Sequence, residues 1–168
     1  MMALGRVYQL EGKHIEAIPY HEGAIALNPS LAQGHYNLGA ALTFSGKAGE
    51  AISCLETAIR LSPRDPWTAH FMARLSEAHL FTGRLDDAVA WGRKARQQTG
   101  PWAWTARLGL VSALGHLGQL DDARTALEEM RGKRPDVSLS FVRTHFPIEN
   151  DADRESLLDG LRKAGLPE

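Results

Sequence analysis

Residues 31–63 read LAQGHYNLGAALTFSGKAGEAISCLETAIRLSP, and within this stretch Gly46 precedes Ala51 by five positions. The same spacing of a glycine and an alanine occurs four times along the chain, at Gly12/Ala17, Gly46/Ala51, Gly83/Ala88 and Gly118/Ala123. Successive glycines are 34, 37 and 35 residues apart. A period of this length is typical of a solenoid built from two-helix units. Because a solenoid presents an extended surface, the pattern favours a protein that holds another polypeptide.

Both residues of the repeated pair have a physical role in such a unit. Each glycine stands where the first helix must end, and glycine adopts the left-handed conformation of a helix C-cap without steric cost. Each alanine stands where two helices are expected to cross closely, and a larger side chain would overpack that contact by about 1–3 kcal/mol. The pattern therefore predicts four tight helix hairpins.

Charged residues follow the same period. Acidic residues fall in the first turn of each expected second helix, at Glu16, Glu50, Asp86, Asp87, Asp121 and Asp122. Basic residues fall near the helix ends, at Arg60, Arg93, Lys94, Arg96, Arg131 and Lys133. This order complements the helix macrodipole, at about 0.3–1 kcal/mol per charge. We therefore interpret the acidic pairs as helix starts and not as a general acid/base site.

The units resemble the tetratricopeptide repeat. The second unit matches it best, with Leu31, Tyr36, Asn37, Leu38, Gly39, Leu42, Gly46, Ala51, Leu55, Ala58, Ile59 and Pro63. The first and fourth units place similar residues, from Leu4, Gly5 and Tyr8 to Pro29 and from Leu110 and Leu114 to Pro135, and the third is looser. The resemblance implies an all-α fold: a right-handed α-solenoid of about four units (about 1–30, 31–64, 65–99 and 100–135), then C-terminal capping helices over 136–168, in a single domain.

The loop between the second and third units is expected to be long, because the segment from Ser62 to Pro66 adds three residues before the next helix. Pro66-Trp67 and Pro101-Trp102 are 35 residues apart, so we expect each proline at the first position of a helix. Trp102 and Trp104 would point about 200° apart on a helix. One of these two tryptophans is therefore expected to be partly exposed.

After Pro135 the repeat pattern stops. Residues 136–146 read as a short helix, and Asn150 is expected to cap a final helix, with Asp153 three positions later. That helix would place four apolar side chains on one stripe, at Leu157, Leu158, Leu161 and Ala164. We expect it to pack on the fourth unit as a cap.

The C-terminal sequence suggests a closer resemblance. DADRE at 151–155, GLRKAGLPE at 160–168, LSPRDP at 61–66 and the Pro-Trp pairs look like the tetratricopeptide tails of bacterial proteins. In those proteins the tail follows a nucleotide cyclase domain or a winged-helix regulator domain. The resemblance implies a regulatory arm whose output domain, with its catalytic residues, lies outside these 168 residues.

Composition narrows the range of partners. The chain has 168 residues, 43% of them hydrophobic, with 19 basic and 20 acidic residues and a net charge of −1. This balance offers no basic footprint for nucleic acid or for an anionic membrane.

The single Cys54 rules out an internal disulfide framework and is expected to be a half-buried thiol. No stretch approaches the length of a membrane span, and no signal peptide is evident. We expect a cytoplasmic protein.

Motifs for catalysis or metal binding are absent from the sequence. It has no phosphate-binding loop, dinucleotide-binding glycine pattern, His-Glu-x-x-His or nucleophile elbow. The seven histidines lack companions at ligand spacing, for example at His14 and His21 or at His70 and His79. We interpret them as solvated residues or residues at the edge of the core, and we expect no enzyme activity, metal or cofactor.

The binding surface is expected on the concave face, which the first helix of each unit lines in this architecture. Removing the expected core positions leaves these groove candidates: Arg6, Gln9, Gln33, Tyr36, Asn37, Thr43, His70, Arg74, Glu77, Leu108 and Ser112. The set is mixed and near neutral, which suits an extended peptide. Asn37 and Arg74 also resemble two members of the carboxylate clamp of some tetratricopeptide domains, but Met2, Arg6 and His70 do not match its other positions.

Two functions follow from these observations. The first is a non-catalytic module that binds a peptide or partner protein in the groove. The alternative is the C-terminal regulatory arm of a nucleotide cyclase or transcription regulator. Since Leu4-Gly5 already occupies the middle of the first helix, no polar capping repeat precedes it in this sequence. We therefore expect either a preceding part of a longer protein or self-association through the open first unit.

Overall fold

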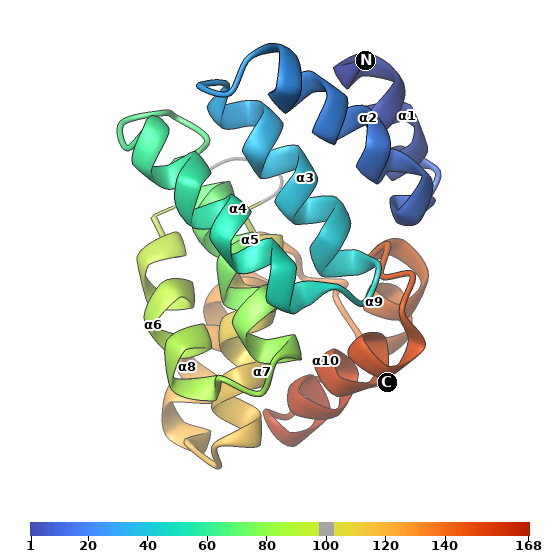
Figure 1. Cartoon of the computed structure of the whole chain (residues 1–168). Coiled ribbons are helices and arrows are strands. Elements are labelled where there is room, and N and C mark those ends of the chain that lie inside the picture. The colour runs from blue at the N-terminus through green and yellow to red at the C-terminus, as the bar shows by residue number, and fades with distance from the viewer. Residues whose placement is uncertain (98–102) are drawn as a thin grey trace.

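The computed structural model describes residues 1–97 and 103–168 of the chain. Over these residues it contains helices and no strand (Figure 1). The first half comprises α1 (Met2–Leu10), α2 (His14–Leu27), α3 (Ala32–Phe44), α4 (Ala48–Leu61) and α5 (Thr68–Phe81). The second half comprises α6 (Leu85–Ala95), the 3₁₀ turn η1 (Thr105–Arg107), α7 (Leu108–His116), α8 (Leu120–Lys133), α9 (Leu139–His145) and α10 (Asp151–Lys163).

Successive helices form antiparallel hairpins that stack side by side. Contacts join α1 to α2, α3 to α4, α5 to α6 and α7 to α8, and the first helices also contact one another in the order α1, α3, α5 and α7. This arrangement confirms the expected all-α solenoid. The first helices line the inner side, and the second helices, such as α4, α6 and α8 in Figure 1, form the outside.

The repeated glycines end the first helices as the sequence predicts. Gly12, Gly46, Gly83 and Gly118 have φ values of 74°, 85°, 73° and 70°. In every case the next residue donates its N–H to the carbonyl five positions earlier, as Lys47 does to Leu42 at 2.9 Å. That bond closes a Schellman motif, which needs a left-handed residue at this position. Glycine therefore sets the turn of all four hairpins.

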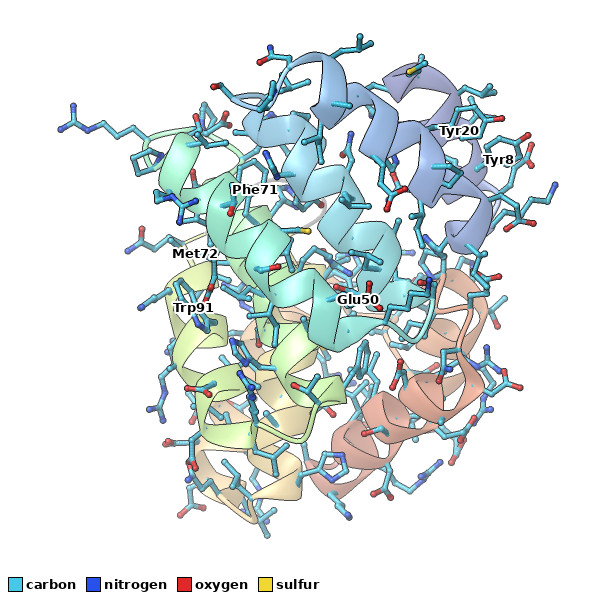
Figure 2. All side chains as sticks on the ribbon, viewed as in Figure 1. Tyr8, Tyr20, Glu50, Phe71, Met72 and Trp91 are labelled. Atoms are coloured by element: carbon cyan, nitrogen blue, oxygen red, sulfur yellow. The ribbon has the colours of Figure 1, made fainter. Side chains whose placement is uncertain are left out.

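The repeated alanines are fully buried. Ala17, Ala51, Ala88 and Ala123 each have 0% exposure, because each lies where two helices cross. The acidic residues expected at the second helices also take their places, as Glu50 does in the first turn of α4 (Figure 2). At the other edge of the stack, Tyr8 and Tyr20 join α1 to α2 through stacked rings 5.4 Å apart (Figure 2).

The start of α5 differs from the prediction. Pro66 lies in a turn, and the helix begins at Thr68 after the N-cap Trp67. Asp65, and not Pro66, leads the chain into the helix. Its carboxylate accepts the N–H of Trp67 at 2.8 Å, and its carbonyl accepts the N–H of Thr68 at 2.9 Å. This Asx turn takes the place of a helix that starts on proline. The matching prediction for Pro101 lies outside the described residues.

The C-terminal helices cap the solenoid. Asn150 accepts the N–H of Asp153 at 3.0 Å, which confirms the predicted N-cap of α10. Leu157, Leu158 and Leu161 are fully buried, and α10 packs on α7 as expected. The two helices cross where a glycine of α7 meets a glycine of α10, at Gly115 and Gly160.

A connection that the sequence did not predict joins the C-terminal segment to the first two units. We call residues 146–150, between α9 and α10, the strap. Its Glu149 carboxylate accepts the N–H groups of His14 and Ile15, at 3.0 and 3.1 Å, where α2 begins. The N–H groups of Glu149 and Asn150 donate to the carbonyl of Phe44, at 2.9 and 3.1 Å, where α3 ends. The strap therefore links the end of the chain to its beginning, and α9 and α10 curl back toward α2 and α3 (Figure 1).

Candidate functional site

A cavity of about 580 Å³ lies on the inner side of the solenoid. One wall consists of α1, α3 and α5, and the other consists of the start of η1, the end of α9 and the strap. Seven of the eleven groove candidates line it: Arg6, Gln9, Gln33, Tyr36, Asn37, His70 and Arg74. The structure thus brings residues from three successive units to one place.

The other four candidates do not line this cavity, and each is fully buried. The hydroxyl of Thr43 donates to the carbonyl of Gly39 at 2.8 Å, and that of Ser112 donates to the carbonyl of Leu157 at 3.0 Å. Leu108 belongs to the core, and Glu77 pairs with Arg74 behind the wall. Glu77 packs against Gly109 of α7, and α10 covers α7 at Ser112.

Sequence reasoning missed several residues of the wall. These are Leu10, His14, Ala40, Phe44, Trp67, Trp104, Thr105, His145, Phe146 and Pro147. Ala40 and Phe44 lie on α3 one and two turns after Tyr36, so helical spacing could have found them. No local signal places Phe146 and Pro147 here, because the strap reaches the cavity only through its contacts with α2 and α3.

Aromatic rings form much of the wall. Tyr36 stacks on Phe71 with ring centroids 4.7 Å apart, and Trp67 lies 4.8 Å from His70. Phe71 sits in the interior, where α3, α4 and α5 meet (Figure 2). Trp104 is buried, but Trp67 is 55% exposed, and Trp102 lies outside the described residues. Flat apolar faces thus border the cavity on the α3 and α5 side.

A buried ion pair supports the centre of this wall. Arg74 and Glu77 lie one turn apart on α5 and form a salt bridge. The Arg74 guanidinium also lies 4.7 Å from the ring of Phe44 and 5.0 Å from that of Phe146. Burial raises the pKa of Glu77 to about 7, although Arg74 acts in the opposite direction. The Arg74 guanidinium is therefore held in one position beside the cavity by Glu77, Phe44 and Phe146.

Two histidines of the wall, His14 and His70, have lowered pKa values. Burial, with a smaller contribution from the nearby Arg74, lowers the pKa of His70 to about 4. Burial likewise lowers the pKa of His14, whose Nε2 lies 2.5 Å from the carbonyl oxygen of Pro147. His14, His21 and His79 are almost completely buried, so the expectation of solvated or edge-of-core histidines is wrong for these three. Their packing between helices excludes water.

Amide side chains order the floor near α1 and α3. Gln33 donates to the Oδ1 of Asn37 at 3.0 Å, and Gln9 donates to the Asn37 carbonyl at 3.1 Å. The Oε1 of Gln9 lies 3.0 Å from the Nε2 of His21. This chain of bonds fixes the rotamer of Asn37, so that its remaining amide protons have a defined direction.

Glu149→Gln tests whether the negative charge of Glu149 stabilises the contact between the strap and α2. The carboxylate sits at the N-terminus of α2, where the helix dipole and two N–H donors favour a negative group. We expect the variant to lose about 1–2 kcal/mol of the free energy of unfolding, measured by urea denaturation. Glu155→Gln is the control, because its exposed pair with Arg143 should contribute less than about 1 kcal/mol. Equal losses in both variants would contradict the role of Glu149.

Residues 1–97 and 103–168 bring together no group of three or more His, Cys, Asp or Glu side chains that could hold a metal ion. Within the same ranges, no helix has the length and apolar character needed to cross a bilayer. Cys54 is half-buried as expected, and burial raises the pKa of its thiol.

Comparisons with known proteins agree with this architecture. Three models of the tetratricopeptide repeat match residues 1–33, 30–98 and 104–129. Among solved structures, MamA is 20% identical, with a TM-score of 0.66 over 98% of this chain and 94% of that chain. YrrB, described as "a TPR protein with an unusual peptide-binding site", is 18% identical, with a TM-score of 0.63 over 97% of this chain and 82% of that chain. A search of curated proteins gives no match.

Proposed function

Because the chain folds as an α-solenoid of tetratricopeptide units, we propose that it is a non-catalytic module that binds a peptide or partner protein on its concave side. The observation that carries this proposal is the convergence of Arg6, Gln33 and His70, from three successive units, on one cavity. A surface assembled from several first helices suits a ligand that touches several units at once. The structural neighbour YrrB is itself described as peptide-binding.

We propose that the seven groove residues around the cavity form the contact surface. Gln9, Gln33 and Asn37 offer side-chain amides, which suit the backbone of an extended chain. Tyr36 and His70 offer flat rings, which suit apolar side chains. The exposed Trp67 extends this surface toward the loop before α5, and exposed tryptophan is enriched at interaction hot spots.

A triple variant tests the proposed face. Arg6→Ala, Gln33→Ala and His70→Ala remove three cavity side chains from α1, α3 and α5 without touching the buried ion pair. We expect at least a tenfold loss of partner recovered by crosslinking from native lysate and quantified by mass spectrometry, because hot spots cluster where several elements meet. Once a partner peptide is identified, titration of the purified proteins should reproduce the loss.

The matched control carries three substitutions on the outer helix α4. Ser53→Ala, Glu56→Ala and Arg60→Ala change exposed side chains, so recovery should stay at the wild-type level. Unchanged recovery with the groove variant, or a loss only with the α4 variant, would show that partners bind elsewhere.

An alternative function is supported by the surface of the first unit. Four apolar side chains of this unit are strongly exposed: Leu4, Val7, Leu10 and Ile15, at 46%, 47%, 85% and 52%. An exposed group of apolar side chains marks a surface that another polypeptide covers. A preceding segment of a longer signalling protein would bury them, as the resemblance to cyclase and regulator tails suggests, and so would a second copy. Light scattering distinguishes these: a mass near the 18.4 kDa of one chain would exclude self-association at that concentration.

A further inference from the structure

The cavity has an unbalanced set of charges. Its described lining includes the guanidinium groups of Arg6 and Arg74 but no Asp or Glu side chain. Glu77 reaches Arg74 from the interior and does not line the cavity. A guanidinium carries five N–H donors, so one buried carboxylate does not use all of them. The wall thus presents positive charge to any ligand.

Hydrogen-bond donors along the same wall lack partners. Within the described part of the chain, Asn37 Nδ2 and Trp104 Nε1 are buried without a hydrogen bond, whereas Arg74 Nη1 pairs with Glu77. Asn37 and Trp104 are only 4% and 3% exposed. Leaving a buried donor unsatisfied costs about 1–3 kcal/mol, and such groups are rare in native proteins. Both residues line the cavity, so a ligand that accepts hydrogen bonds would offset this cost.

The shape of the cavity favours a compact ligand. The strap and the end of α9 close one side of it, where His145, Phe146 and Pro147 form the wall. A volume of about 580 Å³ lies within the range of small-molecule sites, about 300–1,000 Å³. Tyr36, Phe44 and Trp67 supply flat apolar faces, which suit a planar ring.

We propose that this cavity binds a small organic molecule that carries a carboxylate on a planar aromatic body. The carboxylate accepts from Arg74 and Asn37, and the ring lies against Tyr36 and Phe44. This site goes beyond the proposed groove function, because its ligand is a free small molecule and not a polypeptide. Binding of a partner protein on the exposed part of the concave face is compatible with it and is tested separately.

The test compares 2-naphthoate with 2-naphthamide, which has the same shape but no charge. Isothermal titration with the full chain should give a Kd of roughly 0.1–1 mM for the acid, a value suited to a ligand of this size. The amide should bind at least tenfold more weakly, because it lacks the charge that Arg74 recognises. Equal affinities, or no binding of the acid at roughly ten times that Kd, would overturn the proposal.

Substitutions test where the naphthoate binds. Arg74→Gln combined with Glu77→Gln removes both charges of the buried pair together and should abolish the preference for the acid. Arg60→Gln, on the outer surface of α4, removes one arginine charge elsewhere and should leave the preference unchanged. If the double variant does not fold, chemical-shift changes in the wild-type protein decide: changes at Asn37 and Trp104 support the site, and changes confined to the outer helices overturn it.

A carboxylate beside an aromatic ring also occurs at the C-terminus of a polypeptide that ends in phenylalanine. A short peptide of this kind is therefore the second probe. Binding of naphthoate, with or without the peptide, supports a small-molecule site. Binding of the peptide alone would overturn it, and would leave the groove function standing. Loss of partner capture in the groove triple variant, by contrast, has no bearing on the affinity ratio of the two naphthalene probes.

Discussion

Gly115→Ala is expected to lower the free energy of unfolding by about 2–4 kcal/mol, because it separates α10 from α7. A Cβ at position 115 would overlap the carbonyl oxygen of Gly160, and it would lie 3.0 Å from the carbonyl carbon of Gly160 and 3.1 Å from the N of Ala164. These are backbone atoms of α10, so no side-chain rotation relieves the clash. Chemical denaturation followed by circular dichroism measures the loss.

Gly132→Ala is the matched control for this substitution. Gly132 lies near the end of α8 with φ in the usual range, it is exposed, and a Cβ there would meet no heavy atom of the described structure within 4 Å. Alanine is favoured over glycine in a helix by roughly 1 kcal/mol, so this variant should be as stable as the wild type or slightly more stable. A loss in Gly115→Ala no larger than that in Gly132→Ala would show that α10 does not pack closely on α7.

Arg74→Met is expected to cost about 3–5 kcal/mol at pH 8, because it leaves the Glu77 carboxylate buried without its partner. Glu77 is fully buried, and its described surroundings provide no other hydrogen-bond partner. Methionine preserves much of the contact with Phe44 and Phe146, so the lost charge dominates the effect. The free energy of unfolding from urea titration measures it.

The cost should decrease as the pH falls. Burial raises the pKa of Glu77 in the folded chain above its ordinary value of 4.5, and removing Arg74 raises it further. Protonation then stabilises the folded state below that pKa, and this contribution is lost as the pH rises through it. The variant should therefore be less impaired at pH 5 than at pH 8. The double substitution Arg74→Met and Glu77→Gln should cost less than Arg74→Met at pH 8. Equal costs at both pH values would contradict the burial of a charged Glu77.

Local features of the fold were accessible from the sequence. The glycines at 12, 46, 83 and 118, the alanines five positions later and the Asn150 cap all took their expected places. Each of these features depends on contacts within about five residues along the chain or on the crossing of adjacent helices in one hairpin. Their physical causes, backbone conformation and side-chain volume, are properties of single residue types.

The groove was only partly accessible from the sequence. Helical spacing brought seven candidates to the cavity, because residues three or four positions apart share a face. It did not separate Ser112 and Leu108, which α10 and the core bury, from residues that line the cavity. It also did not predict that Asp65 would replace Pro66 as the residue that prepares α5. These outcomes depend on which other element covers a face.

The sequence by itself determined the repeat, the hairpin turns, the close helix crossings and hence a solenoid with a lined inner face. Only the tertiary structure decided that this face is closed on one side, because the contact between His14 and Glu149 joins residues 135 positions apart. Such a contact has no period and no local signal. It forms because α10 docks on α7 through two glycines and thereby carries the strap to the free N–H groups of α2 and the last carbonyl of α3.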